Sequence, residues 1–128
     1  MRTDDLYLVD IIEAADDISR FLQGMTAENS GDDARTRSAI QWKLMILAEA
    51  ATRISDDTRK TFSDVPWDRI RGLRNRMIHG YFTLDWQVVL GMATGAVPSL
   101  AAQAEQILAT RFPDTHRRLR ERRTGDAG

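Results

Sequence analysis

An arginine, a histidine and a tyrosine stand close together in the middle of the chain, at Arg74, His79 and Tyr81. Asn75 follows the arginine directly, and His79 is one of only two histidines in the sequence. A guanidinium group carries a permanent charge that suits phosphate, and an imidazole titrates near neutral pH. These groups suit RNA cleavage without a metal, in which the imidazole exchanges a proton with a ribose 2′-hydroxyl. Arg74 would stabilise the charge that develops at phosphorus, and Asn75 would orient the imidazole or hold the scissile group.

The spacing of these residues constrains how they can meet. On a helix, Asn75 and His79 share a face, whereas Arg74 and His79 lie about 140° apart. The long arginine side chain, a loosened last turn at Gly80, or a second copy of the chain could bring their polar ends together. The spacing therefore points toward a dimeric cleft without requiring one. A second interpretation stays open, because basic residues before a glycine are also common where a helix ends.

Charged residues around the motif extend the candidate site. Four arginines and a single acid, Asp68, lie between Trp67 and Tyr81, in a chain whose net charge is −1. Arg69 and Arg76 are therefore candidates for supporting or RNA-binding roles. Glu49 interrupts an apolar stretch, so it either pairs with Arg53 four residues later or faces the arginine-rich helix.

Composition excludes several other classes of protein. The chain has 128 residues, which suits one domain, and no cysteine, so disulfides and thiolate chemistry are excluded. No cluster of histidines and acids has convincing metal spacing, so we expect no metal and no cofactor. The apolar runs are shorter than the ~20 residues of a membrane span, which predicts no membrane association. The first residues lack the features of a signal peptide, so we expect a cytoplasmic protein.

The elements that must position the motif are helices. Apolar residues recur at helical spacing, and no alternating strand pattern of useful length is present. The predicted helices cover residues 4–23, 33–54, 66–79 and 84–110, with a kink near Val97 and Pro98. The sequence therefore predicts an all-α protein, most simply a four-helix bundle. We expect the bundle to occupy residues 1–110 and a basic, flexible tail to occupy residues 111–128; a basic arm that touches nucleic acid is the alternative for the tail.

The motif region also resembles a known family. Residues 67–89, WDRIRGLRNRMIHGYFTLDWQVV, resemble the signature region of the HepT-like branch of the HEPN superfamily. The resemblance extends to ILAEAATRI at residues 46–54 and to IIEA at residues 11–14, and it covers roughly residues 4–110. Its most specific part is the Arg-x4-His-x-Tyr pattern.

This resemblance implies a fold, an activity and a set of partners. The fold would be a four- to five-helix antiparallel bundle, and the protein would be a homodimer with two motifs in one cleft. The activity would be that of a metal-independent endoribonuclease, the toxin of a toxin–antitoxin pair, acting on RNA. Arg74 and His79 would be the catalytic pair, with Asn75 and Glu49 in support. The partner would be a minimal nucleotidyltransferase antitoxin that transfers AMP to Tyr81. The alternative is a non-catalytic nucleotide-binding or interaction module that works with a nucleotidyltransferase.

Overall fold

The computed structural model describes residues 2–23, 25, 33–80 and 85–127, and the regular elements among them are all helical. The elements in chain order are α1 (Asp4–Leu22), α2 (Ala34–Thr52), α3 (Asp56–Thr61), α4 (Trp67–Gly80), α5 (Trp86–Gly91), the π-helical segment η3 (Met92–Ala96), α6 (Val97–Arg111) and α7 (Pro113–Ala127). The predicted all-α fold is therefore confirmed. None of the helices in these ranges is long and apolar enough to cross a membrane.

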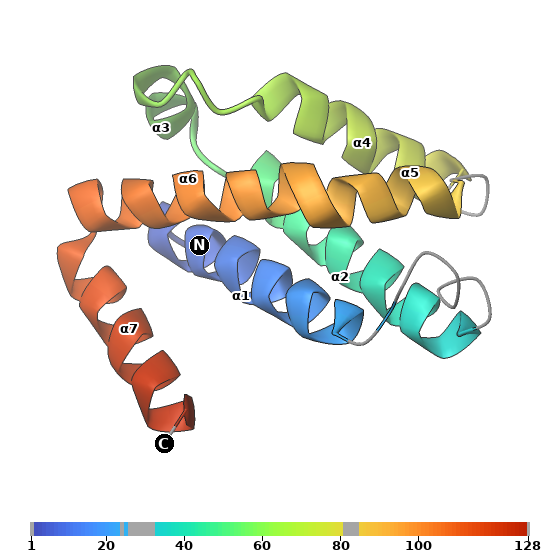
Figure 1. The fold of residues 1–128 in the computed structure, drawn as a ribbon. Coiled ribbons are helices and arrows are strands. Elements are labelled where there is room, and N and C mark those ends of the chain that lie inside the picture. Colours follow the sequence, from blue (N-terminus) through green and yellow to red (C-terminus); the bar gives the residue numbers. More distant parts are fainter. Residues whose placement is uncertain (1, 24, 26–32, 81–84, 128) are drawn as a thin grey trace.

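The long helices form a bundle whose core lies between α1, α2, α4 and α6. Helix α1 packs along α2 and against α6, and α4 packs on α2 (Figure 1). Successive long helices of this bundle run in opposite directions (Figure 1). The largest fully buried side chains come from these helices, from α5 and from the segment just after α2: Leu8, Ile11, Ile12, Ile18, Ile40, Leu44, Leu47, Ile54, Met77, Val89, Ile107 and Leu108.

Local sequence accounts for the first two helices. The structure begins and ends α1 within a residue of the predicted range 4–23, and it begins α2 where the sequence predicts. Asp33 caps α2, because its Oδ1 accepts a hydrogen bond of 3.0 Å from the backbone N–H of Thr36. Such a cap satisfies one of the free donors in the first turn of a helix.

The predicted fourth long helix is interrupted, as the sequence indicated, but slightly earlier than Pro98. The interruption is the π-helical segment Met92–Ala96, and Pro98 follows it in the first turn of α6. Proline lacks the N–H that would continue the preceding turn, and a π-turn is one way in which a helix absorbs such a gap. Thr94 contributes locally, since its Oγ1 donates a 2.9 Å hydrogen bond to the carbonyl of Leu90.

Helix α3, which the sequence did not predict, connects α2 to α4 and is tied to the start of α1. Asp4 accepts hydrogen bonds from the backbone N–H of Ser55 at 3.0 Å, from the Ser55 hydroxyl at 2.6 Å and from the Thr58 hydroxyl at 2.6 Å. Burial alone would raise the pKa of Asp4, but these hydrogen bonds outweigh it and lower the pKa of the carboxyl. The ionised carboxylate therefore fixes the chain that leads into α4.

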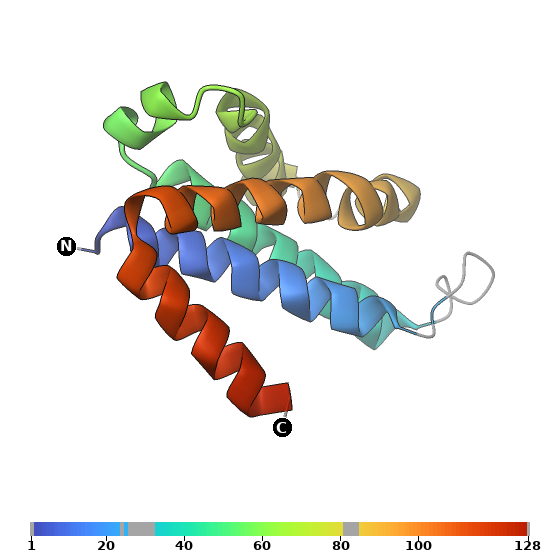
Figure 2. The same cartoon turned by 60° about the vertical axis from the view of Figure 1, so that its left-hand side comes forward.

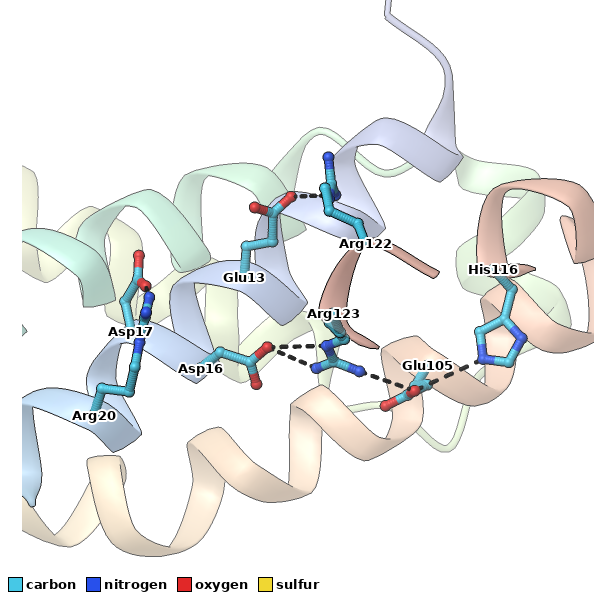
Figure 3. Close-up of polar contacts among 8 residues, drawn as sticks. All are labelled: Glu13, Asp16, Asp17, Arg20, Glu105, His116, Arg122 and Arg123. Atoms are coloured by element: carbon cyan, nitrogen blue, oxygen red, sulfur yellow. Dashed lines mark hydrogen bonds and ion pairs between the residues drawn. The ribbon is translucent and has the colours of Figure 1, made fainter. Parts of the chain in front are cut away.

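The segment expected to be a basic tail is helical in the structure. Helix α7 turns back from the end of α6 and runs beside α1 (Figure 2), where it buries one large apolar side chain, Leu119. Its other anchors are ion pairs, in which Arg123 contacts Asp16 at 2.7 Å and Glu105 at 3.1 Å (Figure 3). The helical form is a finding that the sequence did not predict, whereas the flexibility expected for this segment stays a prediction.

His116 shows how the ion pairs of α7 reach α6. The structure leaves only 18% of its side chain exposed. Its Nε2 lies 3.7 Å from Glu105 Oε1, on the carboxylate that also contacts Arg123 (Figure 3). His116 is therefore a structural residue of the joint between α6 and α7.

Candidate functional site

Helix α4 buries one face and presents two residues of the motif, Asn75 and His79, on the other. Trp67, Ile70 and Met77 are buried against the bundle, which is the apolar stripe expected of a helix that packs on one side. Asn75 and His79 are exposed on the opposite side. The same amphipathic pattern that docks α4 on α2 therefore keeps the candidate catalytic groups accessible.

Glu49 on α2 is the point where the motif is anchored to the bundle. Its Oε2 accepts a 2.8 Å hydrogen bond from Nε of Arg74, and its Oε1 accepts a 3.1 Å hydrogen bond from Nε of Arg53. The side chains of Glu49 and Arg74 are 34% and 32% exposed, so the pair lies at the edge of the core. The two interpretations of Glu49 offered by the sequence therefore hold at once.

Electrostatics keep this anchor ionised. The hydrogen bond from Arg74 lowers the pKa of Glu49, burial opposes that effect, and the hydrogen bond from Arg53 adds to the lowering. The carboxylate therefore stays charged at neutral pH, and its pairing weakens only in acid, as the pH falls through that lowered pKa. A charged acceptor holds the Nε edge of Arg74 firmly, because hydrogen bonds to ionised groups are the stronger ones.

Arg74 keeps part of its guanidinium available. Its Nη1 donates a 3.2 Å hydrogen bond to Oδ1 of Asn75, so the amide of Asn75 is oriented by the arginine. Within the described ranges, no side chain accepts a hydrogen bond from Nη2 of Arg74. A guanidinium held at Nε with a free outer edge suits an incoming phosphate oxygen.

His79 lies apart from this group. It is exposed in the last turn of α4, about 140° around an ideal helix from Arg74. No hydrogen bond or ion pair joins His79 to another side chain among residues 2–23, 25, 33–80 and 85–127. The structure therefore brings Arg74, Asn75 and Glu49 together and leaves His79 unattached. Tyr81, the expected AMP acceptor, lies outside the described residues.

The remaining candidates form a cationic surface on α4. Arg69 and Arg76 are both exposed, and neither makes an ion pair with any residue that the structure describes. On an ideal helix, Arg69, Arg76 and His79 fall within about 80° of one another. The exposed face of α4 therefore carries two free guanidinium groups beside the histidine.

Sequence reasoning missed two large apolar side chains that the structure leaves exposed, Trp42 on α2 and Ile78 on α4. Trp42 lies seven residues before Glu49, on the same side of α2, and is 64% exposed; Ile78, beside His79, is 44% exposed. The seven-residue spacing of Trp42 and Glu49 is the sequence signal that could have indicated this apolar surface.

The described residues contain no group of three or more histidine, aspartate or glutamate side chains placed to hold a metal ion. The polar groups that the structure does gather at the motif are the guanidinium groups of Arg74 and Arg53, the carboxylate of Glu49 and the amide of Asn75. This arrangement can bind an anion, and the exposed imidazole of His79 can transfer a proton.

Comparison with known proteins defines the class to which this chain belongs. Residues 11–107 match the family model described as ribonuclease HepT-like. The "Putative RNase MJ1380" of Methanocaldococcus jannaschii is 32% identical over 99 residues, which cover 77% of this chain and 91% of that protein. The "Probable ribonuclease HepT" of Thermococcus cleftensis is 31% identical over 101 residues, which cover 79% and 92%. No solved structure matches the chain significantly.

The chain therefore belongs to the HepT-like ribonuclease family of the HEPN superfamily. The matched region begins within α1 and ends within α6, so it includes Glu49 and the whole of α4. Helix α7 lies beyond it.

Proposed function

We propose that this protein is a metal-independent endoribonuclease that acts as the toxin of a toxin–antitoxin pair. The observation that carries the proposal is the anchored Arg74. Its Nε is held by Glu49 at 2.8 Å, no described side chain accepts a hydrogen bond from its Nη2, and the same helix carries the exposed His79. Membership in a ribonuclease family supports the choice of RNA as substrate.

The chemistry needs only groups that this chain carries and the substrate's own hydroxyl. The ribose 2′-oxygen forms a bond to phosphorus, and the bond from phosphorus to the 5′-oxygen breaks. The 2′-hydroxyl loses a proton and the 5′-oxygen gains one, and His79 takes part in this exchange. Arg74 stabilises the negative charge on the phosphorus oxygens in the transition state, and Asn75 holds the scissile group.

The geometry favours a site completed by two subunits. One copy of α4 directs Arg74 and His79 about 140° apart, so a second copy supplies the simplest way to face one with the other. Two large apolar side chains are exposed, Ile78 beside His79 in the sequence at 44% and Trp42 on α2 at 64%, and exposed apolar surface commonly binds protein. A two-fold symmetric dimer would place the two α4 helices in one cleft.

A complementation experiment tests the shared cleft. Arg74→Ala and His79→Ala chains carrying different tags are co-expressed, and the mixed dimer is isolated through both tags. If each site takes Arg74 from one subunit and His79 from the other, the mixed dimer keeps one of two sites and about half of the parent's activity. Each variant alone should be inactive. An inactive mixed dimer, with the parent active, would show that both residues act from the same subunit.

The partner of the toxin would be a minimal nucleotidyltransferase that transfers AMP to Tyr81. In that reaction the tyrosyl oxygen forms a bond to the α-phosphorus of ATP, and pyrophosphate leaves. Tyr81 is two residues from His79, so an attached phosphate and adenine would lie beside the catalytic face of α4 and compete for Arg74. This proximity supports a role for the modification as an off switch.

Growth of a host cell tests the pairing. We expect the parent protein to arrest growth, and co-expression of a nucleotidyltransferase encoded beside it to restore growth with one AMP added to Tyr81. A Tyr81→Phe chain should arrest growth equally and resist rescue, because phenylalanine has no hydroxyl to modify. Rescue of Tyr81→Phe would contradict the proposed acceptor. An inert parent that nevertheless binds nucleotide or the transferase would favour the non-catalytic module instead.

A further inference from the structure

A second cationic surface lies at the opposite end of α4 from His79. A cavity of about 470 Å³ opens between α3 and the start of α4. Four basic side chains line it, namely Arg59 and Lys60 from α3 and Arg69 and Arg71 from α4, against two acids, Asp56 and Asp68. The lining is therefore net positive, in a protein whose overall charge is −1.

The pairing of these charges leaves capacity for an external anion. Arg59 is occupied by Asp56. Arg71 lies 4.0 Å from an Asp68 side chain that is 98% exposed, which is a weak, solvent-screened contact. Lys60 and Arg69 make no ion pair with any residue that the structure describes. Three of the four cations can therefore turn to a ligand at little cost.

The position of the cavity relates it to the catalytic face. Arg69 belongs both to the cavity and to the face of α4 that carries His79, and the two residues are about 15 Å apart along an ideal helix. Gly72 lies between them, and a Cβ added there would meet nothing within 4 Å. The helix surface from the cavity to His79 is therefore open to an extended ligand.

We propose that this cavity is a subsite for the RNA strand, binding the phosphodiester backbone a few nucleotides from the phosphate that is cleaved. Repeated negative charge along a strand fits two cationic surfaces on one helix, and a groove of this kind tracks the backbone without reading sequence. The inference rests on the proposed ribonuclease function. It adds to the cleavage site a second site that only a strand of sufficient length can reach.

Binding of uncleavable RNA tests the subsite separately from cleavage. The probes are 2′-O-methyl oligonucleotides, which lack the 2′-hydroxyl nucleophile, as a dinucleotide and a dodecanucleotide. We expect Lys60→Gln with Arg71→Gln to weaken binding of the long probe. Removal of two phosphate contacts should make the plot of log affinity against log salt shallower by about 1.4, at about 0.7 per contact on a single strand. The dinucleotide cannot span the two surfaces, so its affinity should change much less.

Control variants distinguish the subsite from a general effect of charge. Arg118→Gln with Arg120→Gln removes the same charge from exposed positions on α7 and should leave the salt dependence unchanged. Ser63→Asp places a negative charge in the exposed lining of the cavity, and like the double variant it should weaken binding of the long probe. If the cavity variant and the α7 variant lose the same amount of affinity for the long probe, the proposal is overturned. It is also overturned if the cavity variant changes subunit association but not RNA affinity.

The two proposals can fail independently. If the parent cleaves RNA and the Lys60 and Arg71 variant binds the long probe as the parent does, the subsite is wrong and the ribonuclease stands. If the parent cleaves nothing but loses its length-dependent binding in that variant, the subsite stands and the ribonuclease is wrong.

Discussion

Replacement of His79 with alanine is expected to reduce the rate of RNA cleavage by about 10²–10⁴-fold, the range typical of a lost general acid or base. The imidazole is exposed and makes no hydrogen bond or ion pair with the described residues, so its removal should leave the bundle intact. The measurement is the initial rate on a labelled oligoribonucleotide at saturating concentration, together with the thermal melting curve of each protein.

The chain offers a matched control in its other histidine. His116→Ala removes a side chain of the same type from the joint between α6 and α7, where it lies 3.7 Å from Glu105. We expect this variant to melt at a lower temperature and to cleave RNA at the parent rate below that temperature. A His79→Ala protein that cleaves as fast as the parent would exclude His79 from the chemistry.

Replacement of Arg74 with alanine is expected to reduce cleavage by about 10²–10³-fold, the usual effect of removing a group that stabilises developing negative charge. Glu49→Gln should have a smaller effect of about 10-fold, because Arg74 remains but loses the charged acceptor that holds its Nε. The measurement is kcat and KM for both variants on one oligoribonucleotide.

In the proposed mechanism Glu49 positions Arg74, so the effect of replacing Glu49 should differ from that of a purely structural change. We expect Glu49→Gln to lower kcat, since a loosened guanidinium no longer meets the transition state. The control is Arg53→Gln, which removes the other contact of Glu49, at 3.1 Å, and leaves Arg74 bound; it should change kcat little. If the activity of both variants falls only in proportion to the fraction of protein that is folded, this role is contradicted.

Local pattern predicts much of the fold. The apolar spacing from Leu8 to Ile18 determines α1, and Asp33 marks the start of α2 by capping it. The interruption before Pro98 follows from the missing N–H of proline. These features depend on residues within one or two helical turns, which sequence reasoning can weigh.

The elements that sequence reasoning missed depend on distant contacts. Helix α3 has six residues and no apolar stripe, and its cap region is held by Asp4, which is 51 residues away from Ser55 in the sequence. Helix α7 is mostly polar and is held through Arg123, which contacts Asp16 at a separation of 107 residues. Neither pairing has a local signature, so neither helix could be predicted from spacing alone.

In the candidate site, too, some features follow from local sequence and others depend on contacts between distant residues. The types and spacing of Arg74 and His79 indicated a candidate motif and placed the two residues about 140° apart on a helix. The sequence left Glu49 with two possible partners, and only the packing of α4 on α2 shows that both are bound. The sequence likewise did not indicate that Lys60 and Arg69 line one cavity, because that depends on how α3 and α4 are placed.

The most direct test of the central claim, metal-independent cleavage through a ribose 2′-hydroxyl, uses a DNA oligonucleotide that contains a single ribonucleotide. The purified protein is incubated with this oligonucleotide in EDTA. The account predicts cleavage at the bond after the ribonucleotide, a 2′,3′-cyclic phosphate on the product, and loss of cleavage in His79→Ala. Cleavage at deoxynucleotides, or activity that appears only when a divalent metal is restored, would contradict it.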